Sequence, residues 1–354
     1  MAETLYSYMY YDNVTNVTQV TDSVGLNAEL ARVTLLLTSI LTISANIIVL
    51  IVFQYMKTLE NMTGVFVRSL AVADLGVGVC VLIATQSQWA TDWPHEMWSC
   101  KLMGYLLAVM VAVSILSLTC VSIDRYIAII KPLKYKSIVT KRRARIYALI
   151  VWILVLLIFL PAMFGWGGFA QSNDCKVTFD KSLQVSFCMI CILIIPSLII
   201  SIFCYYHILH ACLAQTRHIE RLETLFHEPD TQDTTTRIYE RMLAKMFLIV
   251  ISAFYFSWIP FVIQKIIEVT CQVQVNPVVS FLTAWLGFLN SFLNCIIYII
   301  GHRSFREGFY LMLRSCWRGI TSVCKTCKDL CFSKSRERSQ SQVMQLQDLS
   351  VTDC

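Results

Sequence analysis

The chain has 354 residues, of which 56% are hydrophobic and only 15% are charged, and its mean hydropathy is +0.62. That composition is too apolar for a soluble protein of this length, and it also excludes a disordered, collagenous or small disulfide-rich protein. The net charge of +6 is too small to indicate a nucleic-acid partner. Because the composition is so apolar, we expect a membrane protein.

Seven apolar stretches are each long enough to cross the membrane as a helix, which takes about 20 residues for about 30 Å of hydrocarbon. They are Val33–Met56, Val65–Trp89, Leu102–Ile123, Ile146–Phe164, Leu183–Leu213, Met246–Gln264 and Pro277–Ile300. Pro161, Pro196 and Pro260 fall inside three of them, which membrane helices tolerate. The predicted fold class is an all-α membrane protein, a seven-transmembrane helix bundle with one long polar connection at Gln215–Thr236.

The loop after the third stretch sets the expected orientation. Residues 131–145 carry seven basic residues and no acid, whereas residues 1–32 carry four acids against a single arginine. Because cytoplasmic loops are enriched in Lys and Arg, we expect the N-terminus outside the cell. Residues 1–32 are then an extracellular tail, glycosylated at the sequons of Asn13 and Asn16, and residues 33–301 are the transmembrane domain.

The segment after the last stretch has two predicted parts. Over residues 302–316, Phe305, Phe309 and Leu313 recur every four residues among arginines, which is typical of an amphipathic helix on the inner leaflet, with Cys316 as a palmitoylation candidate. Residues 317–354 are rich in serine, and we expect a disordered cytoplasmic tail. We expect receptor kinases and arrestin to bind this tail, although a solvated tail without a binding partner would have the same composition.

Asp74 is the acid inside the second stretch, and an ionisable group inside a membrane is costly enough to suggest a function. Ser114 in the third stretch and Asn290, Ser291 and Asn294 in the seventh can join it in an oxygen cluster suited to a small hard cation such as sodium. The alternative is that Asp74 only accepts hydrogen bonds from its neighbours.

Two further motifs lie at helix positions where movement can matter. Asp124-Arg125-Tyr126 ends the third stretch, and Arg125 is either one more inner-face charge or the partner of Glu240 in an ion pair that opens and closes. In the sixth stretch Phe254 and Trp258 precede Pro260. A kink beside a large indole can sense a ligand, although an aromatic next to a proline is usually packing.

Taken together, these motifs resemble the rhodopsin-like (class A) G-protein-coupled receptors, from the first stretch to about Cys316. The matches are Ser44-Ala45-Asn46, Leu70-Ala71-Val72-Ala73-Asp74, Trp93, Cys100, Asp124-Arg125-Tyr126, Trp152, Pro196, Phe254, Ser257-Trp258-Ile259-Pro260 and Asn294-Cys295-Ile296-Ile297-Tyr298. The resemblance implies that Arg125 meets the G protein, together with Leu133 of the inner loop that follows the third stretch. It implies that Tyr298 swings inward on activation. It also implies Trp258 as the pivot, Asp74 as the acid of a sodium site, and a disulfide between Cys100 and Cys175.

Departures from the family pattern narrow the expectation. Cys295 stands where the family has proline, and Cys204 stands where it has tyrosine, with Tyr205 one step on. Leu107 replaces the aspartate of amine receptors, which argues against an amine ligand. The phrases Ser122–Ile129, Phe164–Gly167 and Ser280–Trp285 most resemble a small group of orphan receptors that signal through the stimulatory G protein, which raises cyclic AMP.

The outer halves of the third, sixth and seventh stretches supply the expected ligand-binding residues. They are Leu107, Val111, Trp258, Phe261, Val262, Lys265, Trp285 and Phe288. An apolar, aromatic cavity with one cation at its mouth favours a lipidic, aromatic or anionic small molecule. The alternative is that these side chains pack together and leave a receptor that needs no ligand.

The sequence therefore predicts a plasma-membrane receptor whose partners are a heterotrimeric G protein and membrane lipids, with no catalytic residues and no required cofactor. A transporter or ion pump is the alternative from another class, and an adhesion or scaffold protein is a third. A transporter would place several ionisable groups along one path and often has internal repeats, whereas Asp74 stands almost alone.

Overall fold

A computed structural model gives the fold for residues 2–56, 62–87, 97–164, 189–225, 231–271, 273, 275–315 and 317–318. It gives no side-chain description for residues 2–28, 215–225 and 231–240, or for some single positions such as Cys100. The predictions made for Asn13, Asn16, Cys100, Cys175, Glu240, Cys316 and residues 319–354 therefore lie outside what the structure describes.

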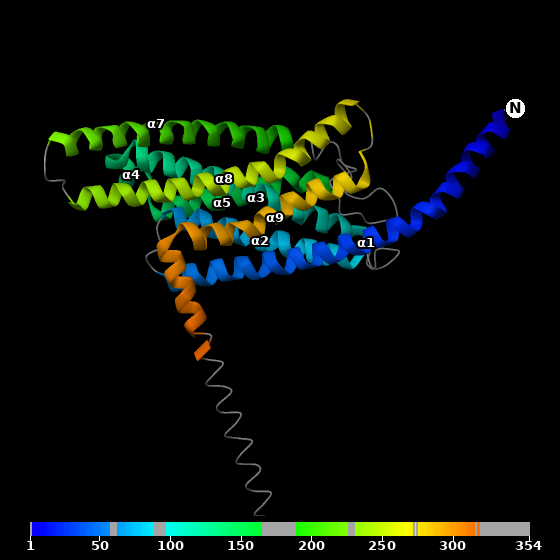
Figure 1. Cartoon of the computed structure of the whole chain (residues 1–354), viewed down its shortest axis with the longest axis horizontal. Coiled ribbons are helices and arrows are strands. Elements are labelled where there is room, and N and C mark those ends of the chain that lie inside the picture. Colours follow the sequence, from blue (N-terminus) through cyan, green and yellow to red (C-terminus); the bar gives the residue numbers. More distant parts are fainter. Residues whose placement is uncertain are drawn as a thin grey trace, which may run out of the picture. The chain divides into compact units, whose positions relative to one another are not determined.

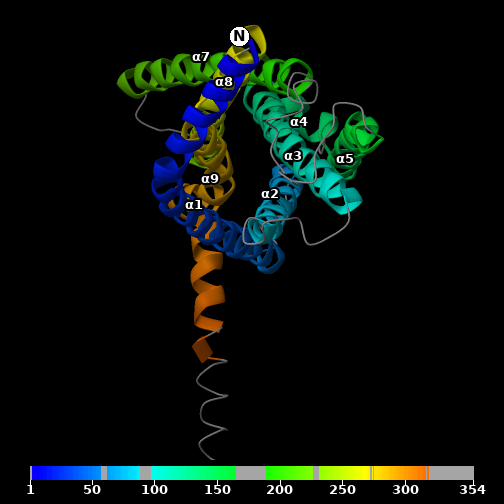
Figure 2. The same ribbon diagram turned by 90° about the vertical axis from the view of Figure 1, so that its right-hand side faces the viewer.

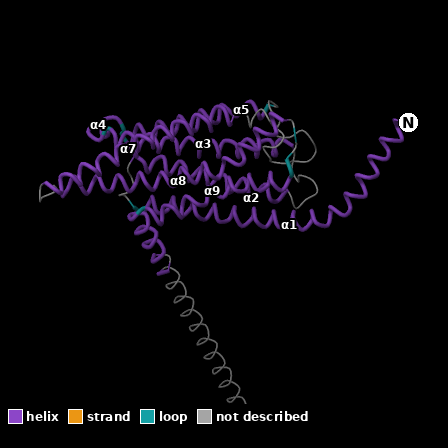
Figure 3. The backbone as a smooth tube through the Cα atoms, turned by 45° about the horizontal axis from the view of Figure 1, so that its top comes forward, coloured by secondary structure: helices purple, strands orange, loops and turns teal. Residues whose placement is uncertain are grey.

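The described elements are all helical, as Figures 1 and 3 show. They are α1 (Ala2–Tyr55), α2 (Met62–Ser87), α3 (Met97–Ile130), α4 (Pro132–Ile138), α5 (Lys141–Met163), the π-helical turn η2 (Met189–Ile194), α7 (Ile195–Leu225), α8 (Thr231–Cys271) and α9 (Pro277–Gly301). A further helix covers 303–315. The predicted all-α class is confirmed for this part of the chain.

Seven of these helices are long and apolar enough to cross a membrane, and each contains the centre of one predicted stretch. At two places the described helices extend beyond the predicted apolar stretches. α7 continues to Leu225 and α8 starts at Thr231, so most of the predicted polar connection Gln215–Thr236 is helical, because residues 215–225 contain good helix formers and no proline or glycine. α1 likewise starts at Ala2, inside the predicted tail, since no proline interrupts residues 2–28.

α3 is the central helix of the bundle. It packs against α2, α5 and α7, while α1 packs against α2 and α9, and α8 against α9; Figure 2 shows this arrangement in a view along the helices. In the most apolar 18-residue segment of α3, 72% of the residues are buried, against 17% in the corresponding segment of α5. Side chains carried by α3, including Arg125, are therefore placed inside the bundle.

Polar side chains tie the helices together at mid-height. Asn46 on α1 donates from Nδ2 to the carbonyl of Ser291 on α9 at 3.0 Å. Trp152 on α5 donates from Nε1 to Ser69 Oγ at 3.1 Å, and Ser69 Oγ lies 3.1 Å from Ser117 Oγ on α3. Such hydrogen bonds between helices hold membrane helices in one register, because lipid offers no alternative partner.

Candidate functional site

Asp74 collects hydrogen bonds from two other helices. Its Oδ1 accepts from Ser114 Oγ on α3 at 2.8 Å and from Ser291 Oγ on α9 at 2.9 Å, and its Oδ2 accepts from Asn294 Nδ2 at 2.8 Å. All four side chains are buried. The structure thus brings together four of the five residues predicted for a cation cluster.

Asn290, the fifth predicted residue, is buried one helical turn from Asn294. Within the part of the chain that the structure describes, Asn290 Oδ1 and Asn294 Oδ1 have no hydrogen-bond partner. A buried carbonyl oxygen without a partner is uncommon and calls for a donor or a cation. Among the described residues, no three His, Cys, Asp or Glu side chains form a group that could hold a metal ion. The possible cation ligands here are therefore one carboxylate and neutral oxygens.

Arg125 lies at the opposite end of α3 from Leu107, in a cluster drawn from α2, α3 and α4, and it is only 2% exposed. Its Nη2 lies 2.9 Å from Asp124 Oδ2, the oxygen that also accepts from Thr63 Oγ1 at 2.7 Å. Tyr135 Oη on α4 donates to Asp124 Oδ1 at 2.9 Å and accepts from Arg125 Nη2 at 3.3 Å. Arg125 also donates to the Thr63 hydroxyl.

Two residues of this cluster, Thr63 and Tyr135, were missed by the sequence reasoning. The expected partner was Glu240, whose side chain the structure does not describe, so that ion pair stays a prediction. Tyr135 had a usable signal, since it is the aromatic residue of the basic loop that follows Asp124-Arg125-Tyr126. Thr63 had none beyond its place at the start of a span.

Leu133 and Tyr126 sit beside this cluster. Leu133 on α4 is 97% exposed, which leaves it accessible to a partner protein. Tyr126 instead packs on α7, with its ring centroid 5.8 Å from that of Phe203 and 6.0 Å from that of His207.

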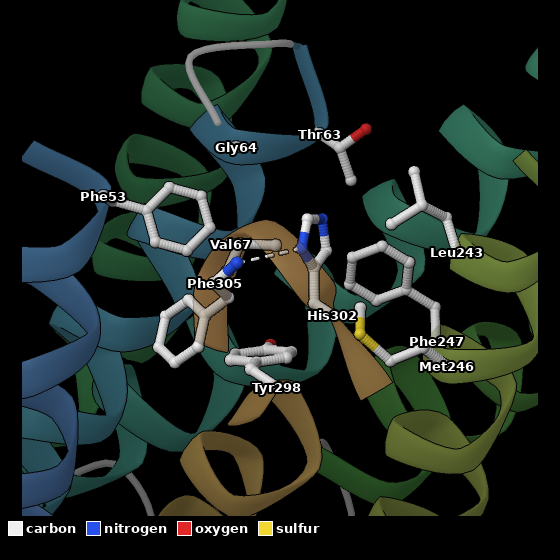
Figure 4. Close-up of a pocket in the computed structure, with 10 residues that line it drawn as sticks. All are labelled: Phe53, Thr63, Gly64, Val67, Leu243, Met246, Phe247, Tyr298, His302 and Phe305. Atoms are coloured by element: carbon white, nitrogen blue, oxygen red, sulfur yellow. Dashed lines mark hydrogen bonds between the residues drawn. The ribbon is translucent and has the colours of Figure 1, made fainter. Parts of the chain in front are cut away.

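A pocket opens at the same end of the bundle, where α1, α2, α8 and α9 meet (Figure 4). Its cavity volume is about 20 Å³, and it is lined by Phe53, Thr63, Gly64, Val67, Leu243, Met246, Phe247, Tyr298, His302 and Phe305. Tyr298 is buried between the rings of Phe247 and Phe305, and its hydroxyl has no partner among the described residues. The tyrosine predicted to swing inward on activation therefore lines this pocket.

His302 closes the end of α9 beside this pocket. Its Nδ1 accepts from the backbone N–H of Phe305 at 3.2 Å, and this bond caps the first turn of the helix 303–315. Burial, and to a smaller extent the charge of Arg125, lowers the pKa of His302 below its ordinary value of 6.5. The neutral imidazole is thus the form that fits this turn.

The aromatic residues of α8 form a column on the other side of the Asp74 level. The ring of Trp258 lies 6.2 Å from that of Phe254, 5.7 Å from that of Phe261 and 6.3 Å from that of Phe288 on α9. Gly287 on α9 allows this approach, because a Cβ there would lie 3.1 Å from the indole. Pro260 lies within α8, where the kink was predicted.

Most of the predicted ligand-binding residues are buried in the described part of the chain. Leu107, Val111, Trp258, Phe261 and Lys265 are buried, whereas Val262, Trp285 and Phe288 are half-buried. Trp285 Nε1 donates to Thr38 Oγ1 on α1 at 3.0 Å, and Lys265 Nζ lies 2.8 Å from Glu268 Oε2. Glu268 was missed, although its i,i+3 spacing from Lys265 gave a signal.

Comparisons with known proteins agree on one family. Residues 45–298 match the model of the 7 transmembrane receptor (rhodopsin family). The mouse (Mus musculus) "G-protein coupled receptor 52" is 35% identical over 84% of this chain and 83% of its own length, and the mouse "Probable G-protein coupled receptor 21" is 33% identical over 82% of each. Squid rhodopsin superposes with a TM-score of 0.72 at 21% identity, over 82% of this chain and 86% of the squid chain.

Proposed function

This chain belongs to the rhodopsin family of seven-transmembrane receptors, and from that premise we propose that it activates the stimulatory heterotrimeric G protein and raises cyclic AMP. Receptors of this family are multi-pass proteins of the plasma membrane that signal through G proteins and are not enzymes. The choice of the stimulatory class is supported by the resemblance of Ser122–Ile129, Phe164–Gly167 and Ser280–Trp285 to that group of orphan receptors.

The Arg125 cluster carries the proposal. Arg125 is neutralised by Asp124 and enclosed by Thr63 and Tyr135, so its guanidinium does not face solvent. A buried charge pair of this kind is stable only while both partners stay in place. We expect an outward movement of α8 to enlarge the adjoining pocket, admit Tyr298 and present Arg125 to the G protein.

The basic residues around this cluster support an orientation with the Arg125 end in the cytoplasm and the N-terminus outside. Lys131, Lys134, Lys141, Arg142 and Arg143 surround α4 and the start of α5. They would meet anionic lipids and the G protein together. Glycosylation at Asn13 and Asn16, a Cys100–Cys175 disulfide and palmitoylation of Cys316 fit the same orientation.

The Asp74 cluster fits a sodium ion. Asp74 supplies one negative charge, and the two unpartnered amide oxygens of Asn290 and Asn294 supply neutral donors of the kind a hard cation prefers. Ser114 and Ser291 would complete the set. These residues lie between the Trp258 column and the Arg125 cluster, so a cation here would favour the closed packing of α2, α3 and α9.

The test compares the wild-type protein with Arg125→Ala at matched surface expression, with cyclic AMP measured in the absence of added ligand. We expect a raised cyclic AMP level in the wild type and a loss of most of that rise in Arg125→Ala. Calcium release and inhibition of cyclase are measured in parallel to identify the G protein. A calcium response or an inhibition of cyclase that Arg125→Ala removes, in cells where the wild type does not raise cyclic AMP, would refute the stimulatory class.

A further inference from the structure

Lys265 is a fully buried cation at the end of the bundle opposite Arg125, with a side chain that is 0% exposed. An ammonium group inside a membrane protein needs a counter-ion, because its desolvation is costly. Glu268, one turn further along α8, supplies it: its Oε2 lies 2.8 Å from Lys265 Nζ, and its side chain is 12% exposed. The counter-ion therefore lies nearer to the surface than the cation that it neutralises.

The second oxygen of Glu268 connects this ion pair to α9. Glu268 Oε1 accepts from Gln264 Nε2 at 2.8 Å, and the same Nε2 donates to Ser280 Oγ on α9 at 2.6 Å. Thr283 on α9 donates in turn to Gln264 Oε1. The carboxylate that neutralises Lys265 thus also orients the amide that joins the two helices.

On its other side Lys265 adjoins the aromatic column. Its Nζ lies 5.5 Å from the centre of the Phe261 ring, a cation–π distance, and Phe261 contacts Trp258 at 5.7 Å between ring centres. A change of partner at Lys265 can therefore shift Phe261 and, through it, the indole of Trp258, which is the proposed activation pivot.

We propose that Lys265 is an anion-recognition site that Glu268 fills in the resting receptor, and that the activating ligand is an amphiphilic carboxylate that takes the place of Glu268. The inference rests on the proposed receptor function. Exchange of one carboxylate for another keeps Lys265 neutralised, while the apolar part of the ligand lies against Phe261 and its neighbours. Glu268 then moves into solvent and Gln264 loses one acceptor, which alters the tie between α8 and α9. A cationic amine would be repelled by Lys265.

The first experiment removes the internal carboxylate and replaces it from solution. Glu268→Ala removes the Cγ methylene and the carboxylate; propionate supplies the same carboxylate with one additional carbon, and propionamide is the neutral control. The full-length protein is purified in lipid nanodiscs, and its thermal unfolding midpoint is measured with each compound. We expect propionate to raise the midpoint of Glu268→Ala at concentrations about tenfold or more below those at which propionamide acts, since hydrogen bonds to charged groups are the stronger ones. Glu268→Ala combined with Lys265→Met should respond to neither.

The second experiment uses amphiphilic probes on the intact pair. Oleate and 4-phenylbutyrate are compared with their methyl esters in an assay of GTP-analogue uptake by purified stimulatory G protein. We expect at least one carboxylate to raise uptake in the wild type and in Lys101→Met, but not in Lys265→Met. Lys101 is the control because it is a lysine on α3 at the same end of the bundle as Lys265. Glu268→Gln, which keeps the shape but not the competing charge, should respond at lower concentrations.

The proposal is overturned if propionate and propionamide act alike on Glu268→Ala, if neither carboxylate probe acts on the wild type, or if a response survives Lys265→Met. The proposed function is judged separately, by the ligand-free difference between the wild type and Arg125→Ala in the same uptake assay. Basal uptake that depends on Arg125 but is insensitive to every carboxylate would leave the receptor assignment intact and refute this site.

Discussion

Tyr135→Phe tests whether the Arg125 cluster holds the receptor at rest. The substitution keeps the ring and removes the hydroxyl that bonds Asp124 at 2.9 Å and Arg125 at 3.3 Å. A hydrogen bond to a charged group contributes about 1.5–3 kcal/mol. Asp124 keeps its bonds to Thr63 and Arg125, so we take the lower end, about 1.5 kcal/mol. Lost from the resting state alone, this is about a tenfold rise in the ratio of active to resting receptor.

The assay is the initial rate of GTP-analogue uptake by the stimulatory G protein in membranes with matched receptor number and no ligand. We expect a several-fold higher rate for Tyr135→Phe and no rise when it is combined with Arg125→Ala. Tyr147→Phe, at a 52% exposed tyrosine of α5, is the matched control and should leave the rate unchanged. An unchanged or lower rate in Tyr135→Phe would refute the view that this cluster restrains Arg125.

Three further predictions concern the rest of the bundle. Gly287→Ala places a Cβ 3.1 Å from the Trp258 indole and should lower the free energy of unfolding by about 1–3 kcal/mol, measured by thermal unfolding; an unchanged midpoint would show that Trp258 moves aside freely. Sodium at ten times its Kd should stabilise the wild type by about 1.4 kcal/mol, or about 2–4 °C, relative to choline, and Asp74→Asn should lose this gain; equal gains in both would exclude Asp74 as a ligand. Since the pKa of His302 is lowered, the unfolded chain takes up a proton first as pH falls, so stability should drop as pH passes below about 6.5. His302→Asn, which can still accept from Phe305 N–H, should flatten this part of the pH profile, and an identical slope would point to another group.

The helix bundle was predictable because hydropathy alone identifies membrane spans. The centre of each predicted stretch lies in one described membrane-length helix, since about 20 apolar residues in lipid have no other stable backbone arrangement. Helix ends were not predictable in the same way. α7 and α8 extend past the apolar residues into polar sequence, where helix propensity and tertiary contacts decide and hydropathy gives no information.

The candidate site divides along similar lines. The partners of Asp74 were predictable because few buried groups can satisfy a carboxylate in a membrane, and Ser114, Ser291 and Asn294 contact it directly. Thr63 and Tyr135 were not, because their contacts with Asp124 join helices across about 61 and 11 residues of sequence and depend on how α2 and α4 pack. The burial of the predicted ligand-binding residues also depends on side-chain placement, which no sequence pattern encodes.

The most direct test of the central mechanism uses purified components. The full-length protein in lipid nanodiscs is mixed with purified stimulatory G protein, and the ligand-free rate of GDP release is compared between the wild type and Arg125→Ala, with an inhibitory G protein as the parallel sample. The mechanism predicts a rate at least several-fold higher for the wild type, confined to the stimulatory G protein. Equal rates for the wild type and Arg125→Ala, or faster release from the inhibitory G protein, would contradict it.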